Sequence, residues 1–357
     1  MARRKGGGGP QKGSGRAGRS GRGRGLSGDA RAAAKRKERE VRDARDRKKI
    51  LARLSVVEPD GLVVCMYGSH ADVAFADGSV RFCLLTPKVH KLFGVCVGDR
   101  VWTEKGSGDD ERIIVGRAER STSLRRRRSE EDRTGHVIAA NIDQLAITAA
   151  LYEPPLRTGA LDRYLLLASV LDIEPLLVLT KVDLAPMDDP GWDVLAPYRE
   201  LGLRIVGTSA VSGRGMDELR DALRGRLTAF AGHSGVGKSA LCQALGLTDA
   251  PETGDLSRSG GRIRGRHTTS IARLLELPSG GWVVDTPGVR SIGLVDIDRG
   301  DVRVHFPELA EAGADCEYSD CLHLDEDGCA VRKAVKKGEL SKARYAGYAR
   351  LMESIED

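Results

Sequence analysis

The stretch Gly232–Ser239 reads GHSGVGKS and decides the fold of the central part of this 357-residue chain. It matches the pattern G-x-x-x-x-G-K-[ST] and lies between an apolar run, LTAFA, and a helix-forming run, ALCQAL. A strand before the motif and a helix after it are the context of a P-loop, which binds the phosphates of a nucleoside triphosphate. Lys238 would supply positive charge to the β- and γ-phosphates, and Ser239 would coordinate Mg²⁺. The predicted contacts are Gly232, His233, Ser234, Gly235, Val236, Gly237, Lys238, Ser239 and Ala240.

Apolar strands alternate with helical patterns from His136 onward, on both sides of this motif. Near-continuous apolar runs such as PLLVLTKVD indicate strands that are buried on both faces, as in a mostly parallel sheet covered by helices. Ligands of such sheets bind at the carboxyl ends of the strands. The sequence therefore predicts an α/β P-loop domain over residues 136–295.

Two short motifs upstream of the P-loop predict guanine as the base. TKVD at Thr180–Asp183 ends an apolar strand, where Asp183 would accept hydrogen bonds from guanine N1 and the exocyclic amine, and Lys181 would lie over the base. The motif resembles the NKxD element of GTPases with threonine in the asparagine position, and a hydroxyl offers fewer hydrogen bonds than an amide. TSA at Thr208–Ala210 fits the companion loop that contacts guanine through its backbone. The predicted base contacts are Thr180, Lys181, Val182, Asp183, Ser209 and Ala210.

A third motif, DTPG at Asp285–Gly288, follows the apolar strand WVV. Asp285 would hold Mg²⁺ through a water molecule, and the Gly288 N–H would sense the γ-phosphate. Ordinary GTPases have their base-reading loops after this motif, whereas here these loops come first, so the domain is predicted to be circularly permuted. The helix predicted over Met216–Arg224 leads directly into the P-loop strand, which closes the original termini without moving the site.

The run RHTTS at Arg266–Ser270 supplies a threonine for Mg²⁺, for which we favour Thr269 over Thr268. In many GTPases a glutamine directly after DxxG orients the attacking water, but Val289 occupies that position and cannot do so. His267 is the nearest titratable candidate for this role, and the alternative is a solvated loop histidine. We therefore expect slow intrinsic turnover that a partner accelerates by ordering the loop.

The segment before the α/β domain has a different pattern. Short alternating apolar runs separated by Gly and Asp-Gly turns fill residues 51–118 and predict an OB-type β-barrel, a fold that is used for oligonucleotide binding. Residues 119–135, which include Arg125–Arg128, are interpreted as a linker, with a phosphate-contacting loop as the alternative.

The first 50 residues are strongly basic, with 18 Lys and Arg against 5 Asp and Glu, whereas the remainder of the chain has a net charge of −7. Their Gly- and Arg-rich composition predicts a disordered arm, although residues 29–54 have helix-forming potential on a surface. A basic arm on an acidic body indicates contact with a polyanion, RNA or DNA. A solvated tail is the alternative.

Three of the seven cysteines and one histidine gather in fourteen residues near the C-terminus. The set Cys316, Cys321, His323 and Cys329 suits one tetrahedral, structural Zn²⁺ with no open coordination position. Unliganded surface thiols are the alternative. The mostly helical pattern that surrounds the set predicts a zinc-binding domain over residues 296–357. The other four cysteines lie in apolar settings and are interpreted as buried free thiols.

From about Leu51 onward, the chain resembles the circularly permuted GTPases of small ribosomal subunit biogenesis, the RsgA or YjeQ family. The resemblance rests on the barrel, AANIDQ at Ala139–Gln144, TKVDL, GHSGVGKS, GRHTTS, DTPG followed by an apolar residue, and the Cys₃His spacing. It implies binding to the small ribosomal subunit and its rRNA late in maturation, and GTP hydrolysis that the subunit stimulates. It also implies a part in hydrolysis for His267. Thr180 and the Gly/Arg arm depart from the family pattern.

The predicted protein is a GTP hydrolase in which hydrolysis is coupled to release from the subunit, with Mg²⁺ accompanying GTP. The alternatives are a GTP-regulated RNA-binding protein with little hydrolysis and a nucleic-acid-associated P-loop ATPase. No leader peptide or membrane-spanning run is evident in the sequence, so we expect a cytoplasmic protein, acting as a monomer.

Overall fold

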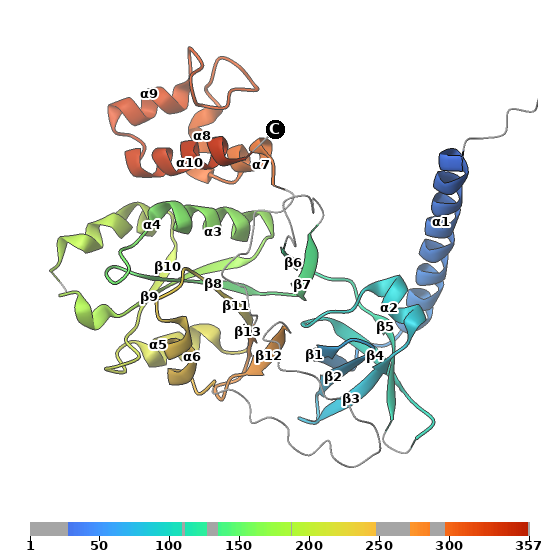
Figure 1. Cartoon of the computed structure of the whole chain (residues 1–357). Coiled ribbons are helices and arrows are strands. Elements are labelled where there is room, and N and C mark those ends of the chain that lie inside the picture. Colours follow the sequence, from blue (N-terminus) through green and yellow to red (C-terminus); the bar gives the residue numbers. More distant parts are fainter. Residues whose placement is uncertain are drawn as a thin grey trace, which may run out of the picture. The chain divides into compact units, whose positions relative to one another are not determined.

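The computed structural model describes residues 28–108, 111–126, 135–186, 188–247, 272–285 and 297–355 (Figure 1). The chain divides into two units, Met1–Lys48 and Lys49–Asp357. Within the described residues, no helix combines the length and the apolar character needed to cross a membrane.

Helix α1 spans Gly28–Leu54. Residues 28–50, predicted as part of a disordered arm, are helical instead, because this segment consists largely of Ala, Arg, Lys and Glu, which favour helices. Arg36 donates to Glu40 at 3.0 Å, an i,i+4 pair that supports an isolated helix. The end of α1 is anchored by apolar contacts, since Leu54 is buried and Ile50 and Leu51 pack against the barrel core.

Five strands and one helix form the predicted OB-type barrel, which is confirmed. They are β1 (Gly61–Tyr67), β2 (His70–Phe75), β3 (Val80–Leu85), α2 (Pro87–Phe93), β4 (Arg100–Lys105) and β5 (Arg112–Arg117). The strands pair in the order β1-β2-β3-β5-β4, and β4 pairs back to β1, so the barrel closes. The β3–β5 pairing is parallel. The inward-facing Val63, Val73, Val101 and Ile114 are inaccessible to solvent and form part of the barrel core.

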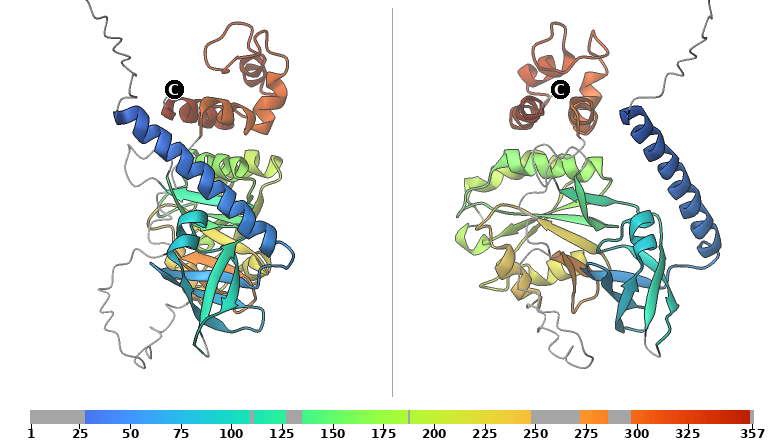
Figure 2. Two further views of the ribbon diagram at one scale, coloured as in Figure 1. Left: turned by 90° about the vertical axis from the view of Figure 1, so that its right-hand side faces the viewer. Right: turned by 45° about the vertical axis from the view of Figure 1, so that its right-hand side comes forward.

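The central domain is an α/β sheet in the order β10-β9-β8-β11-β13-β12, parallel except for β12. Its strands are β8 (Gln144–Ala150), β9 (Glu174–Thr180), β10 (Arg204–Gly207), β11 (Leu227–Ala231), β12 (Arg273–Glu276) and β13 (Trp282–Asp285). Helices α3 and α4 cover one face, and α5 and α6 cover the other (Figures 1 and 2). These helices are α3 (Thr158–Val170), α4 (Ala196–Glu200), α5 (Met216–Leu223) and α6 (Lys238–Ala244), with 3₁₀ turns η1 (Val182–Leu184) and η2 (Pro190–Leu195). The predicted α/β architecture is confirmed.

Two further strands link the barrel to the sheet. Part of the predicted linker, Ser123–Arg126, is strand β6, which pairs with β7 (His136–Ala140). The barrel and the sheet also share an edge, because β1 pairs with β12 at Cys65 and Arg273.

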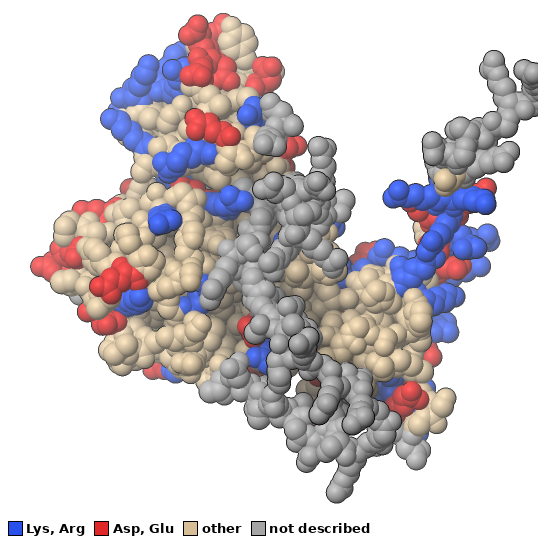
Figure 3. Space-filling view, in the orientation of Figure 1, with Lys and Arg blue, Asp and Glu red and all other residues tan. Residues whose placement is uncertain are grey.

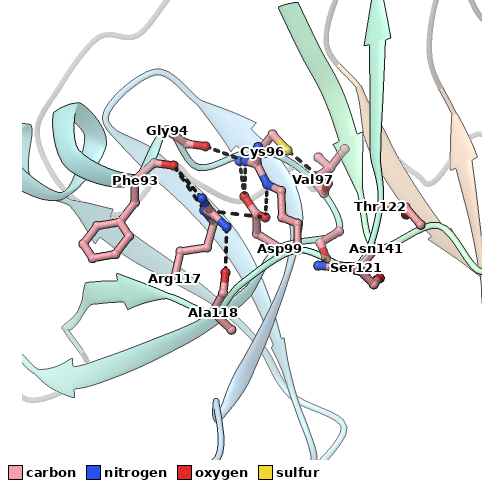
Figure 4. Close-up of polar contacts among 12 residues, drawn as sticks. Phe93, Gly94, Cys96, Val97, Asp99, Arg117, Ala118, Ser121, Thr122 and Asn141 are labelled. Atoms are coloured by element: carbon pink, nitrogen blue, oxygen red, sulfur yellow. Dashed lines mark hydrogen bonds and ion pairs between the residues drawn. The ribbon is translucent and has the colours of Figure 1, made fainter. Parts of the chain in front are cut away.

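Buried polar contacts around Asp99 fix this connection (Figure 4). The Asp99 carboxylate is inaccessible to solvent and accepts hydrogen bonds from Arg120 Nε at 2.7 Å, Arg120 Nη2 at 2.8 Å and the Cys96 N–H at 2.7 Å. Asn141, from the AANIDQ motif, donates to the Gly98 carbonyl at 2.8 Å. The motif therefore ties the α/β domain to a barrel loop.

The C-terminal part is helical, as predicted, and packs on α3. It contains α7 (Arg299–Val304), α8 (Pro307–Gly313), α9 (Ala330–Lys337) and α10 (Lys342–Ser354). Arg344 of α10 reaches Asp162 of α3 at 2.5 Å and Glu308 of α8 at 2.7 Å. Tyr198 also donates to Asp162, at 2.9 Å. A buried ion network therefore joins this part to the α/β domain.

Candidate nucleotide-binding and metal sites

The P-loop connects β11 to α6 and depends on glycine backbones. Gly232, Gly235 and Gly237 have φ values of 144°, 83° and 95°, a region that side chains disfavour. A Cβ at Gly232 would lie 2.2 Å from the Thr148 carbonyl oxygen. The three glycines therefore let the loop turn tightly against the end of β8.

The first residues of α6 carry the polar groups of the P-loop. Lys238 Nζ donates to the carbonyls of Gly232 at 2.6 Å and His233 at 2.5 Å. Ser239 and Ala240 follow in the same helical turn. The Lys238 ammonium group is thus held inside the P-loop, where it can exchange these two carbonyls for phosphate oxygens as hydrogen-bond partners.

Thr180, at the end of β9, ties the TKVD loop to the P-loop. Its hydroxyl donates to the Val236 carbonyl at 2.5 Å and lies 3.1 Å from the Ala149 carbonyl oxygen. The side chain is only 5% exposed. The hydroxyl is thus bonded to the backbone of the P-loop, and the predicted contact of Thr180 with the nucleotide stays a prediction.

The remaining base-loop residues gather at the same edge of the sheet. The Val182 N–H donates to the Thr208 carbonyl at 3.2 Å, which joins the loops after β9 and β10. Lys181 has a left-handed backbone, with a φ of 56°, and Asp183 and Ala210 are exposed. Ser209 is buried. The structure therefore brings both predicted base loops beside the P-loop and leaves the Asp183 carboxylate open to a ligand.

Asp285 ends β13 close to α6. Burial, together with the negative charge of Asp285, raises the pKa of Cys242 in α6 to about 11, so the field of the carboxylate reaches that helix. The Ser239 hydroxyl and the Asp285 carboxylate are oxygen donors of the kind that Mg²⁺ prefers, and the residues present fit this ion. Arg273, which the sequence analysis missed, lies with Nε 2.9 Å from Asp285 Oδ2.

Three other predicted site residues, His267, Thr269 and Gly288, lie outside the described residues. Their roles stay predictions.

Comparisons with known proteins identify the family. A sequence model of the RsgA GTPase family matches residues 117–295. The crystal structure of YjeQ from Thermotoga maritima is 30% identical in sequence, covers 84% of this chain and 99% of its own, and superposes with a TM-score of 0.67. The crystal structure of YloQ, a circularly permuted GTPase, is 28% identical, covers 84% of this chain and 95% of its own, and has a TM-score of 0.65.

The chain belongs to the RsgA GTPase family. The family resemblance inferred from the motifs is confirmed, as is the circular permutation of the domain. GTP binding and, in general terms, GTP hydrolysis follow from membership of this GTPase family.

The C-terminal part contains the predicted Cys₃His cluster, in which Cys316, Cys321, His323 and Cys329 place their ligand atoms within 4.8 Å of one another. Cys316 Sγ lies 3.9 Å from Cys329 Sγ, and the His323 Nδ1 lies 3.5 and 3.6 Å from these two sulfurs. Tetrahedral Zn²⁺ with bonds of 2.3 Å to sulfur requires ligand atoms about 3.8 Å apart. These four residues therefore fit a zinc ion in this GTPase.

Proposed function

We propose that this GTPase binds the small ribosomal subunit and its rRNA in the cytoplasm, acts there as a monomer late in maturation, and leaves when GTP is hydrolysed. The observation that carries the proposal is the meeting of the P-loop with both base loops, in a chain of the RsgA family that also has an OB-type barrel and a Cys₃His cluster. The proposed domains are the barrel (51–118), the GTPase domain (136–295) and the zinc-binding domain (296–357).

Guanine selection is assigned to the loops after β9 and β10. The exposed Asp183 carboxylate would accept hydrogen bonds from guanine N1–H and the exocyclic amine, whereas adenine has an acceptor at N1 and no amine at C2. The stem of Lys181 would lie along the base, and the backbone of Ser209 and Ala210 would contact its edge. Thr180 would fix this arrangement relative to the phosphates, because its hydroxyl is bonded to the P-loop itself.

Phosphate binding is assigned to the P-loop and its magnesium ligands. Backbone N–H groups of residues 232–240 would surround the phosphates, and Lys238 would exchange its carbonyl partners for β- and γ-phosphate oxygens. Ser239, Thr269 and, through water, Asp285 would hold Mg²⁺, which supplies positive charge to the phosphate oxygens.

The hydrolytic step is assigned to His267 as the group that positions the attacking water. Val289 has no polar group for this task, and the Gly288 N–H would contact the γ-phosphate. Ordering of this arrangement by the ribosomal subunit would account for stimulated turnover.

RNA contact by the barrel is supported by exposed aromatic side chains. Tyr67 and Phe82 are both 46% exposed, and the His70 ring stacks on Phe82 at a centroid distance of 4.7 Å. Arg81 and Arg112 lie over the Phe75 ring, on the other face of these strands, since side chains alternate along a strand. Exposed aromatic rings are what proteins use to stack the bases of single-stranded RNA.

The zinc-binding domain supplies a second basic surface. Lys and Arg gather on the surface over α9, which carries Arg332, Lys333, Lys336 and Lys337 (Figure 3). Phosphate neutralisation by such residues is independent of RNA sequence. One structural Zn²⁺ at the Cys₃His cluster would hold α9 in position.

The proposal is tested by measuring GTP and ATP hydrolysis with and without purified small ribosomal subunits, with large subunits as the control. We expect slow GTP hydrolysis alone and stimulation on the order of a hundredfold by small subunits, because partners that complete a GTPase site commonly add at least this much. Lys238→Ala should abolish the stimulated rate.

Two results would favour the alternatives. Guanine-specific binding with negligible hydrolysis in the presence of subunits would indicate a GTP-regulated RNA-binding protein. Equal use of ATP and GTP would indicate a P-loop ATPase. Stimulation by large subunits alone would contradict the proposed partner.

A further inference from the structure

Arg273 occupies a position next to the proposed magnesium site. Strands β12 and β13 pair so that Arg273 lies directly opposite Asp285. Arg273 Nε donates to Asp285 Oδ2 at 2.9 Å, and the two side chains are 33% and 44% exposed. The Asp285 carboxylate, which is proposed to hold Mg²⁺, is thus paired with the Arg273 guanidinium.

This cation opposes a divalent ion at the same carboxylate. A guanidinium about 3 Å from an oxygen engages that oxygen in a charge-assisted hydrogen bond. Its positive charge also repels Mg²⁺ at a distance where water screens only partly. Strand β13 pairs in parallel with β11, the strand that leads into the P-loop, so Asp285 ends its strand at the edge of the sheet where the P-loop and Ser239 begin.

Arg273 also lies where the barrel joins the central sheet. On the side of β12 away from Asp285, the Arg273 backbone pairs with Cys65 of β1, the first strand of the barrel. Arg273 is therefore the residue at which the barrel sheet and the magnesium carboxylate meet.

We propose that Arg273 is a positioning residue that competes with Mg²⁺ for Asp285 and sets the Mg²⁺ concentration that the protein needs to retain guanine nucleotide. The proposal rests on the proposed assignment of Asp285 to magnesium. A merely structural Arg273 would change strand stability without changing the dependence of nucleotide retention on Mg²⁺.

The test uses the full chain loaded with a fluorescent GDP analogue, whose dissociation rate is measured over a series of MgCl₂ concentrations. In R273Q the concentration that gives half-maximal retention should fall about three- to tenfold, since one nearby charge is removed. R273M, a second neutral variant, should behave alike, and R273K, which keeps the charge, should stay near the wild type.

Arg226 provides a matched control at the amino end of the same sheet. It forms an ion pair with Glu174 in which the side chains are 37% and 46% exposed, much as in the Arg273 pair. R226Q should leave the Mg²⁺ midpoint unchanged.

An unchanged or higher midpoint in both R273Q and R273M would overturn the proposal, as would an equal fall in R226Q. Ribosomal subunits play no part in this measurement, so its failure is distinct from a failure of subunit stimulation. Absence of GDP binding in every variant would overturn the nucleotide site itself and this proposal with it.

Discussion

A buried aspartate holds the barrel to the segment that leads into the GTPase domain, and another holds the zinc-binding domain to the GTPase domain itself, but the hydrogen bonds of the two carboxylates differ. Asp99 accepts three short hydrogen bonds, two of them from Arg120. Asp162 accepts from Arg344 and Tyr198 through one oxygen, whereas its Oδ2 has no hydrogen-bond partner within the described part of the chain. Burial raises the pKa of Asp162 despite the neighbouring Arg344.

The difference indicates that the two connections have different stabilities. A buried ion contributes when its hydrogen bonds are complete and opposes folding when they are not. We therefore infer that the contacts around Asp99 are the more stable of the two. The free energy needed to separate the zinc-binding domain from the GTPase domain should be lower than that needed to separate the barrel.

The largest expected effect is the loss of the zinc-binding fold on metal removal. A structural zinc site contributes on the order of 10 kcal/mol to a small domain, and here its ligands lie in and beside the loop that joins α8 to α9. Chelation should release one zinc per chain and raise hydrogen exchange across residues 297–355 while the barrel stays protected. Equal exchange in both regions, or no released zinc, would contradict this account.

The next effect is expected at Arg344. Arg344→Met leaves the Asp162 and Glu308 carboxylates buried without a cation, which should destabilise the connection by about 3–5 kcal/mol. Urea unfolding and hydrogen exchange in α3 and α10 would measure it. Lys342→Met, at an exposed position of the same helix, is the control and should change stability little. A similar loss in both variants would show that the buried network has no special role.

The smallest effects are expected from neutralising each of the two buried aspartates, which compares Asp99 with Asp162 directly. Asp99→Asn weakens charged hydrogen bonds and should cost about 2–3 kcal/mol, whereas Asp162→Asn should cost about 1 kcal/mol at pH 7. Because the native pKa of Asp162 is raised, the wild type should lose stability relative to Asp162→Asn as the pH rises from about 4 through that native pKa. Unfolding free energies at several pH values test this, and equal losses for the two variants at pH 7 would remove the distinction.

Local patterns predicted most of the fold. The P-loop was evident because its glycines, its strand and its helix are neighbours in sequence, and the zinc cluster because its four ligands lie within fourteen residues. The barrel followed from alternating strands and turns. Each of these signals depends on residues that are close along the chain.

The contacts that the sequence did not predict join distant residues. Asp162 and Arg344 are 182 positions apart, and Arg120, which donates two hydrogen bonds to Asp99, lies in the segment predicted to be a linker. The pairing of Arg273 with Asp285 depends on the register of β12 against β13, which no short motif encodes. For helix α1, the sequence predicts helix-forming potential over residues 29–54 but assigns most of the segment to a disordered arm, because its charged composition leaves few apolar contacts to hold it.

The central claim, that this chain reads guanine through the TKVD loop, is tested most directly by nucleotide binding to Asp183→Asn. The carboxamide cannot accept both guanine hydrogen bonds, so GTP affinity should fall on the order of a hundredfold or more. Xanthosine triphosphate, which carries a carbonyl where guanine has its amine, should bind the variant better than the wild type, because the amide N–H can donate to that carbonyl. Unchanged GTP affinity, or loss of both nucleotides without any gain for xanthosine triphosphate, would contradict the account.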